Sequence, residues 1–194
     1  MKIIGITGGI ASGKSTVSLY LEDKYDAYIF DADKEAKALQ QLSFVKDKIL
    51  QSFPNLEDFS ASSIAKEVFQ NSESQSKINN IIHPMISDLI LERINEKKDL
   101  HNIFVVDAAL IIEAGIFQQY QKSGAKLILI IADEELRLKR ALHRANLDQE
   151  TIKDRMRLQM KDDEKIKYAD YVIDNNGLEF ELFSKVDQII EKII

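Results

Sequence analysis

The segment Thr7–Thr16 reads "TGGIASGKST" and contains the spacing Gly8-x-x-x-x-Gly13-Lys14-Ser15 of a phosphate-binding loop. An apolar run, residues 2–7, precedes this loop, and a helical pattern, residues 15–24, follows it, as the motif requires. Glycines let backbone N–H groups turn toward phosphate oxygens, and the following helix adds the positive end of its dipole. Lys14 can reach the β- and γ-phosphates of a nucleotide, while Ser15 offers its hydroxyl to Mg²⁺. Motif and context together disfavour the alternative, an ordinary glycine-rich turn between a strand and a helix.

Short runs rich in Ile and Val predict five buried strands: residues 2–7, 27–30, 102–106, 126–131 and 171–173. Near-continuous apolarity is typical of a parallel sheet covered by helices on both faces, and helical patterns alternate with these runs. We therefore predict a three-layer, doubly wound α/β fold around a parallel five-stranded sheet. Pro84 interrupts a stripe of isoleucines, so we expect one helix to end before it and another to begin there. A last amphipathic helix is expected over residues 178–194.

Two mostly helical stretches, residues 33–98 and 136–167, interrupt the alternation, and we interpret both as insertions at one edge of the sheet. The second holds ten basic and six acidic residues, a net charge of +4 in a chain whose net charge is −6. Arg137, Arg140 and Arg144 share one face of the expected helix, and guanidinium groups suit phosphate oxygens. We expect a lid that excludes water from the phosphates. The alternative is a solvated helix with internal salt bridges.

Acidic residues follow the second and third expected strands, at the edge where parallel sheets bind their ligands. Asp31 and Asp33 lie two residues apart and point the same way on an extended chain. A carboxylate here either accepts a proton from a substrate hydroxyl or caps the helix expected over residues 34–40. Asp107 ends the third strand, as a magnesium-binding acid would. Glu113 is either a metal or substrate contact or a solvated helix residue.

Two further polar residues leave alternatives open. His83 precedes Pro84 and is either catalytic or a packed or helix-capping histidine. Asn175 lies in the turn after the last strand, where its amide can read the edge of a nucleobase or serve the turn itself.

The composition is that of an ordinary globular domain, with 45% hydrophobic and 30% charged residues among 194. The absence of cysteine excludes disulfides and thiolate metal sites and fits the reducing cytoplasm, where we expect the protein. The N-terminal apolar run is too short for a signal peptide, and no eighteen consecutive residues are apolar, so no membrane partner is expected. The net charge of −6 argues against general nucleic-acid binding. We expect small-molecule partners and a monomer, with an oligomer left open.

Several segments resemble the dephospho-CoA kinase family, which acts in the last step of coenzyme A synthesis, and the likeness runs nearly end to end. The segment "IGITGGIASGKSTV" resembles the opening of that family, "FDADKEAK" its acidic motif and "VFQ…INNIIHPMI" its substrate-domain signature. The segment "VVDAALIIEAG" is similar to its third-strand region, and "RLKRALHRANLDQETIKDRMRLQM" with "ADYVIDNNG" to its lid and final strand. Two positions depart from the family pattern: Ala109 stands where proline is frequent, and Ala61 where arginine is usual.

The resemblance implies a P-loop NTPase fold with the architecture of nucleoside monophosphate kinases. Its parts would be a core (residues 1–32, 99–135 and 168–194), a helical acceptor-binding insertion (33–98) and a helical lid (136–167). The implied activity is ATP-dependent phosphorylation of the 3′-hydroxyl of the dephospho-CoA ribose, with Mg²⁺. The catalytic residues would be Asp33 as the base, Lys14 and Arg140. Contacts to ATP would come from Gly8, Gly9, Ala11, Ser12, Gly13, Lys14, Ser15, Thr16, Arg144 and Asn175. Acceptor contacts would come from Asp33, His83 and Glu113, and metal ligands would be Ser15 and Asp107.

Other functions for a phosphate-binding loop make different demands on the sequence. A nucleoside monophosphate kinase remains an alternative, since its phosphate acceptor needs no base at Asp33. A GTPase-like switch would need an Asn-Lys-x-Asp motif to select guanine, and the chain contains none. A nucleic-acid-dependent ATPase would need a broader basic surface than residues 136–167 supply.

Overall fold

The computed structural model describes residues 1–54, 56, 59–60, 63–64, 72–144 and 148–194, so Ala61 and the Val68–Gln70 motif lie outside the described residues. Parallel strands form a five-stranded sheet in the order β2-β3-β1-β4-β5. Their bounds are β1 Lys2–Gly8, β2 Tyr28–Asp31, β3 Ile103–Asp107, β4 Lys126–Ile131 and β5 Tyr171–Asp174. The strands begin and end within one residue of the predicted bounds, and the doubly wound α/β fold is confirmed.

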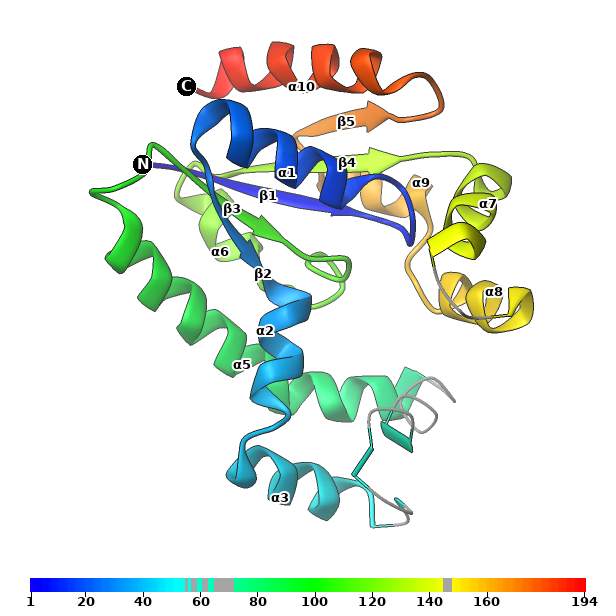
Figure 1. Cartoon of the computed structure of the whole chain (residues 1–194). Helices are drawn as coiled ribbons and strands as arrows, with labels where there is room; N and C mark the ends of the chain where they lie inside the picture. The colour runs from blue at the N-terminus through cyan, green and yellow to red at the C-terminus, as the bar shows by residue number, and fades with distance from the viewer. Residues whose placement is uncertain (55, 57–58, 61–62, 65–71, 145–147) are drawn as a thin grey trace.

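Helices cover both faces of the sheet (Figure 1): α1 (Lys14–Tyr25) and α10 (Glu179–Ile193) on one face, α5 (Ser72–Lys97) and α6 (Gln118–Lys122) on the other. Strand β3 shows why its sequence is apolar throughout. Ile103 and Val105 join the hydrophobic cluster that contains residues of α1 and α10, while Phe104 and Val106 join the cluster on the opposite face. A strand buried on both faces has no position for a solvent-facing polar residue.

The phosphate-loop helix α1 is held at its far end by Asp187 of α10. The carboxylate of Asp187 accepts hydrogen bonds from the Tyr20 hydroxyl at 2.8 Å, the Tyr25 hydroxyl at 2.7 Å and the Lys24 ammonium at 2.8 Å. The ring of Tyr20 also stacks on Phe183, with ring centroids 4.1 Å apart. These contacts fix the C-terminal end of α1, and its N-terminal end carries the phosphate loop.

The first insertion projects from the sheet as α2 (Ala32–Leu39), α3 (Ser43–Ser52) and the first half of α5 (Figure 1). Its apolar side chains continue the core of the sheet instead of forming a separate one. Val45 and Ile49 of α3 belong to the same hydrophobic cluster as Phe104 and Val106 of β3. The insertion is therefore packed onto the edge that carries β2 and β3.

Helix α5 runs through Pro84, so the prediction of a helix boundary there is wrong. Proline has no N–H, and its ring crowds the preceding turn, which normally ends or bends a helix. Here Ile82 before the proline and Ile86 after it are both buried in one cluster, so packing on both sides offsets the lost hydrogen bond. The two halves of α5 run in different directions in Figure 1, as expected for a helix bent at proline.

The second insertion folds as α7 (Glu134–Arg144), α8 (Gln149–Arg157), α9 (Asp162–Lys165) and the 3₁₀ helix η1 (Ile166–Tyr168). Helices α7 and α8 pack on each other beyond the carboxyl ends of β1 and β4 (Figure 1). Asp148 caps α8, because its Oδ1 accepts the N–H of Thr151 at 2.9 Å. Among the described helices, none is both long and apolar enough to span a membrane.

Candidate active site

The carboxyl ends of β1, β2 and β3 meet at one edge of the sheet, and acidic side chains follow two of them. In the strand register Asp107 pairs with Asp31 on one side and with Ile6 on the other. Since β1 continues directly into the phosphate loop, this register places the acids beside the loop. The sheet thus assembles the site from segments far apart in the sequence.

The phosphate loop turns into α1 at Gly13. This residue is the N-cap of α1 and has a φ of 110°, a left-handed conformation that residues with a side chain rarely adopt. A glycine cap has no side chain, which leaves the first N–H groups of α1 available to an anion. The N–H of Ser12 donates to the Gly9 carbonyl at 3.1 Å and closes the loop. The loop is therefore an anion cradle at a helix N-terminus.

Asn175 holds this loop from behind. Its buried amide donates to the Ser12 carbonyl at 2.7 Å, and a Cβ on Gly13 would collide with that amide. Arg140 Nη2 donates to the Asn175 carbonyl at 3.1 Å. A cavity of about 160 Å³ opens here, and it brings together several of the predicted ATP-binding residues. Its lining is Ala11, Gly13, Thr16, Arg140, Asn175, Gly177, Glu179 and Leu182.

The lid touches the outer side of the loop through Gln159, which the sequence pattern did not single out, and through Arg137, which belongs to the predicted arginine face. The Gln159 side chain accepts the N–H of Ile10 at 2.9 Å. The Arg137 guanidinium lies against Gly9, so closely that a Cβ on Gly9 would collide with it, and its ion pair with Asp162 is long, at 4.0 Å. Arg144 is the last residue of α7, and its side chain lies outside the described part of the structure.

Lys14, Asp33 and Asp107 form the charged centre of the site. Burial lowers the pKa of Lys14, although the carboxylates of Asp107 and Asp33 work against that shift. Burial raises the pKa of Asp33 and of Asp107, and Lys14 opposes both shifts. Asp107 also accepts the Ser18 hydroxyl at 2.7 Å. A cation between two partly desolvated carboxylates is an arrangement that active sites commonly use.

The two acids that follow β2 have separate roles. Asp31 is the N-cap of α2, because its Oδ1 accepts the N–H of Lys34 at 2.9 Å. Asp33 lies in the first turn of the same helix and is exposed to the cleft, and the nearby backbone N–H of Ala109 works to lower its pKa. Capping therefore uses Asp31 and leaves Asp33 available for chemistry.

Buried polar atoms without partners mark where a ligand fits. Five side-chain atoms of this kind occur in the described ranges, and four of them belong to the phosphate loop, the lid or the segment after β3. These four are Ser12 Oγ, Glu113 Oε2, Arg137 Nε and Arg140 Nη1. Three are hydroxyl or guanidinium donors, which phosphate oxygens would satisfy. The unpaired donors fit a bound nucleotide.

Oxygen atoms suited to Mg²⁺ lie in the same place. Ser15 is exposed at the start of α1 and offers a hydroxyl, and Asp107 offers a carboxylate. Mg²⁺ prefers such oxygen ligands and is usually held by one or two of them together with phosphates. Outside the undescribed segments, no group of three or more His, Cys, Asp or Glu could form an all-protein cage. The residues fit Mg²⁺ bound as its nucleotide complex.

Asp33 and His83 line a cavity on the side of Asp33 that faces away from the phosphate loop. This cavity, of about 150 Å³, lies between α2, α5 and the segment 108–116. Burial lowers the pKa of His83, which favours its neutral form. The remaining lining is largely apolar and consists of Ala32, Ala36, Gln40, Ile78, Asn79, Ile82, Ile86, Ala108, Leu110, Ile111, Ala114 and Ile116. A planar apolar group would fit here beside two polar side chains.

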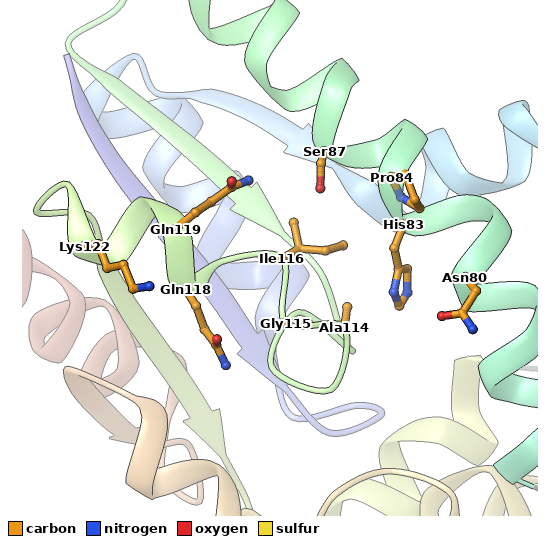
Figure 2. A pocket seen from close by; sticks show the side chains of 10 residues that line it. All are labelled: Asn80, His83, Pro84, Ser87, Ala114, Gly115, Ile116, Gln118, Gln119 and Lys122. Carbon is orange, nitrogen blue, oxygen red and sulfur yellow. The ribbon is translucent and has the colours of Figure 1, made fainter.

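A wider groove of about 470 Å³ adjoins this cavity and shares His83, Ala114 and Ile116 with it. Figure 2 shows His83, Pro84 and Ser87 on α5 opposite the segment 114–116 and α6. The groove is mainly polar, with side chains that can both donate and accept hydrogen bonds. Its polar residues are Asn80, His83, Ser87, Gln118, Gln119 and Lys122.

Glu113 lies at neither of these hollows. Its Oε1 accepts the N–H of Met160 at 3.1 Å and pairs with the ammonium of Lys165, also at 3.1 Å. Lys165 is fully buried, which the sequence did not reveal, because it stands among exposed charged residues. Lys165 can be buried because it pairs with Glu113, which is distant in the sequence, and no local sequence pattern predicts such a partner.

Comparison with known proteins connects this site to one family. A family model described as dephospho-CoA kinase matches residues 2–180. A dephospho-CoA kinase of Fusobacterium nucleatum is 36% identical over 196 residues, with 98% of each chain covered. One from Saccharomyces cerevisiae is 32% identical over 208 residues and covers all of this chain and 83% of its own.

Solved structures agree with the fold described above. A protein from Thermus thermophilus superposes with a TM-score of 0.81 at 25% identity, covering 100% of this chain and 98% of its own. Dephospho-CoA kinase from Campylobacter jejuni gives a TM-score of 0.64 at 30% identity, with the same coverage. A shikimate kinase from Acinetobacter baumannii, at 16% identity and a TM-score of 0.60, covers 100% of this chain and 93% of its own and shares the fold alone.

Proposed function

The chain belongs to the dephospho-CoA kinase family, and from this premise we propose that it transfers the γ-phosphoryl group of ATP to the 3′-hydroxyl of the dephospho-CoA ribose. One observation carries the proposal for the site. Asp33 belongs to both halves of the cleft: its carboxylate interacts with Lys14 of the phosphate loop, and it lines the cavity that holds His83. A base in that position can take a proton from a hydroxyl group while the hydroxyl oxygen faces the γ-phosphate.

The reaction needs one proton transfer and one displacement. Asp33 accepts the proton of the 3′-hydroxyl, the oxygen bonds to the γ-phosphorus, and the bond from that phosphorus to the β-phosphate oxygen breaks, releasing ADP. Lys14 and Arg140 stabilise negative charge on the phosphoryl oxygens. Arg140 Nη1 is buried and has no partner within the described residues, so it is free to donate to ATP. Arg144 is proposed as a further lid contact to ATP.

Adenine of ATP is proposed to occupy the cavity between Arg140 and Asn175, behind the loop. Phosphates then extend along residues 8–16, where the N–H groups of the loop and of α1 point. Mg²⁺ would be held by Ser15 and, directly or through water, by Asp107. When bound, the ion supplies charge neutralisation between the β- and γ-phosphates.

The acceptor is proposed to fill the two adjoining hollows beside α5. Its nucleoside would enter the apolar cavity, which places the ribose next to Asp33 and His83. Its long arm would then leave along the groove of Figure 2, since the two hollows share His83, Ala114 and Ile116. The arm of dephospho-CoA carries amide groups, and Asn80 and Gln118 offer matching donors and acceptors. Glu113 lies behind this region and meets the lid, as developed below.

The direct test incubates the protein with Mg·ATP and, separately, dephospho-CoA, adenosine or AMP, and identifies the phosphorylated product. We expect coenzyme A from dephospho-CoA, and little turnover of the two acceptors that lack the arm. Transfer to the 5′-phosphate of AMP alone would instead identify a nucleoside monophosphate kinase. We also propose that the protein acts as a monomer in the cytoplasm, which light scattering during gel filtration tests for the oligomeric state.

A further inference from the structure

Lys165 is a fully buried lysine at the end of α9. Among the Lys, Arg, Asp and Glu residues that the structure describes, no other is buried to this degree. Its ammonium lies 3.1 Å from Glu113 Oε1 and donates to the Ala109 carbonyl at 3.4 Å. Burying a charge is costly unless it is paired, and a buried ion pair by itself adds little stability over an apolar pair. The position of the pair therefore points to a role besides stability.

Ala109 connects Lys165 to Asp33 through its backbone. The Ala109 carbonyl accepts the Lys165 ammonium and also the Thr7 hydroxyl, the latter at 3.2 Å. Asp33 lines the same cavity as Ala108 and Leu110, the two neighbours of Ala109, and the backbone N–H of Ala109 works to lower the pKa of the Asp33 carboxyl. Donors from β1 and from α9 thus hold the backbone of a residue that lies beside the proposed base. Displacing Ala109 would move this backbone N–H relative to the Asp33 carboxylate.

Glu113 adds a second lid contact, at Met160, to that of Lys165. Its Oε1 accepts both the Lys165 ammonium and the N–H of Met160. The neighbouring residue, Gln159, accepts the N–H of Ile10 in the phosphate loop. Two consecutive lid residues, between α8 and α9, therefore contact two loops of the site. Gln159 contacts the phosphate loop, and Met160 contacts the segment after β3 through Glu113.

We propose that Lys165 and Glu113 are positioning residues that hold Ala109, and through it Asp33, in place for phosphoryl transfer. This inference rests on the proposed function, in which Asp33 is the base. Lys165 and Glu113 touch neither substrate in this arrangement and act only through the backbone. Their charge also reaches the loop: burial is the main cause of the lowered pKa of Lys14, and Lys165 adds to it.

A double-mutant cycle with Asp33 tests the inference. Single-turnover transfer to dephospho-CoA is measured for the unmodified protein, Lys165→Met, Asp33→Asn and the double variant. We expect Lys165→Met to slow transfer roughly tenfold, because a small displacement of a catalytic group costs this much or more. In the Asp33→Asn background the same substitution should slow transfer less than about twofold, since no base is left to position. ATP affinity should stay within about twofold throughout.

Two further variants control the cycle. Lys165→Arg keeps the cation and should recover most of the rate. Lys126→Met removes another lysine–carboxylate pair, in which the ammonium also lies 3.1 Å from its partner, Asp170. Lys126 begins β4, at the end of the strand that is remote from the site, so transfer should be unchanged. If Lys165→Met does not fold, Glu113→Gln replaces it in the cycle, because the amide keeps the shape and an acceptor oxygen.

The outcomes separate clearly. An equal loss in both Asp33 backgrounds means that the lysine acts independently of the base, and this contradicts the inference. An unchanged rate in Lys165→Met contradicts it too. Absence of transfer to dephospho-CoA by the unmodified protein contradicts the proposed function instead, and the cycle is then repeated with whichever acceptor is phosphorylated.

Discussion

Asp31 and Asp33 stand on the same turn at the end of β2, yet only Asp31 is used as a cap. Its Oδ1 accepts the N–H of Lys34 at 2.9 Å, whereas the Asp33 carboxylate caps no helix and lies within electrostatic reach of Lys14. Asp31 stabilises the start of the helix α2, and Asp33 lies in the first turn of that helix. Because Asp31 supplies the cap, replacing Asp33 should change catalysis without removing a helix cap.

Asp33→Asn should lower kcat for dephospho-CoA by about 10²–10⁴, the usual contribution of a general base, with ATP affinity unchanged. The asparagine keeps the shape of the side chain but takes up no proton at neutral pH. Rapid-quench kinetics and titration with a fluorescent ATP analogue measure the two quantities. Near-normal turnover would show that Asp33 is not the base.

The same substitution should raise the melting temperature at pH 7. Neighbouring protein atoms displace part of the water around Asp33 and raise its pKa above the unfolded value, so ionisation at neutral pH works against folding. Removing the charge therefore stabilises the protein at pH 7. Since Asp33 is exposed to the cleft, solvent screens this effect and the gain should be small. The gain should disappear at a pH below both pKa values, where the carboxyl is neutral in either state. Scanning calorimetry at several pH values measures the difference, and a lower melting temperature for Asp33→Asn at pH 7 would contradict the predicted sign.

Activity should be confined to a narrowed pH range. The raised pKa of Asp33 moves the acidic limb of kcat/KM above the ordinary aspartate value of about 3.9, since the base must be ionised. The lowered pKa of Lys14 moves the alkaline limb below the ordinary lysine value of about 10.4, since the lysine must be charged. A pH profile of kcat/KM with saturating ATP measures both limbs, and the acidic one should vanish in Asp33→Asn.

Gly13→Ala should abolish ATP binding. At this position a Cβ must adopt a φ of 110° and would also collide with the Asn175 amide that holds the loop. Gly124→Ala is the matched control, because Gly124 also has a positive φ, 94°, but its Cβ would meet no atom within 4 Å. We expect the control to lose only about 1–2 kcal/mol of stability and to bind ATP normally. Isothermal titration calorimetry compares the two.

Gly9→Ala should act through Arg137. The new methyl group takes the space of the guanidinium, which is the flexible end of a long side chain and can move away without unfolding the protein. Gly9→Ala and Arg137→Ala should each raise KM for ATP several-fold, and the double variant should be no worse than either. Lys139→Ala, on the exposed part of α7, serves as control. Additive losses would mean that Gly9 and Arg137 act separately.

Asp187→Asn should destabilise the protein without changing its kinetics. Burial works to raise the pKa of Asp187, but hydrogen bonds from Lys24 and two tyrosines outweigh it and lower that pKa. The stability gained from the carboxylate is thus present above the unfolded pKa of about 3.9 and lost as pH falls through the folded pKa. The cluster is partly exposed, so we expect a loss of about 1 kcal/mol and a melting temperature lower by about 2–4 °C. A change in kcat would mean that α10 contributes to the site.

The sequence predicted the sheet closely because its signals are local. Runs such as Ile103–Val106 are apolar throughout only when both faces of a strand are covered, and each such run here is a strand. The phosphate loop is also encoded locally, in glycine spacing and in the helix that follows. Acids at strand ends were placed correctly at one edge of the sheet, because parallel strands bring their carboxyl ends together.

Long-range packing accounts for what the sequence did not predict. Pro84 is tolerated inside α5 because buried isoleucines on both sides hold the helix, which no window around the proline reveals. Lys165 is buried because Glu113, far away in the chain, pairs with it. The amide of Asn175 donates to the Ser12 carbonyl, a contact that the sequence around Asn175 does not encode. Each of these depends on a partner that only the fold brings near.

The order β2-β3-β1-β4-β5 divides the chemistry between two sides of one strand. Asp33, the segment 108–116 and the insertion follow β2 and β3, while Arg140 and Asn175 follow β4 and β5. The phosphate loop follows the central β1, which is where the proposed donor and acceptor must meet. Such an arrangement is modular: evolution can exchange one substrate by altering loops on one flank, with the opposite flank and the transfer point conserved. An inhibitor that joins both substrates would have to cross β1.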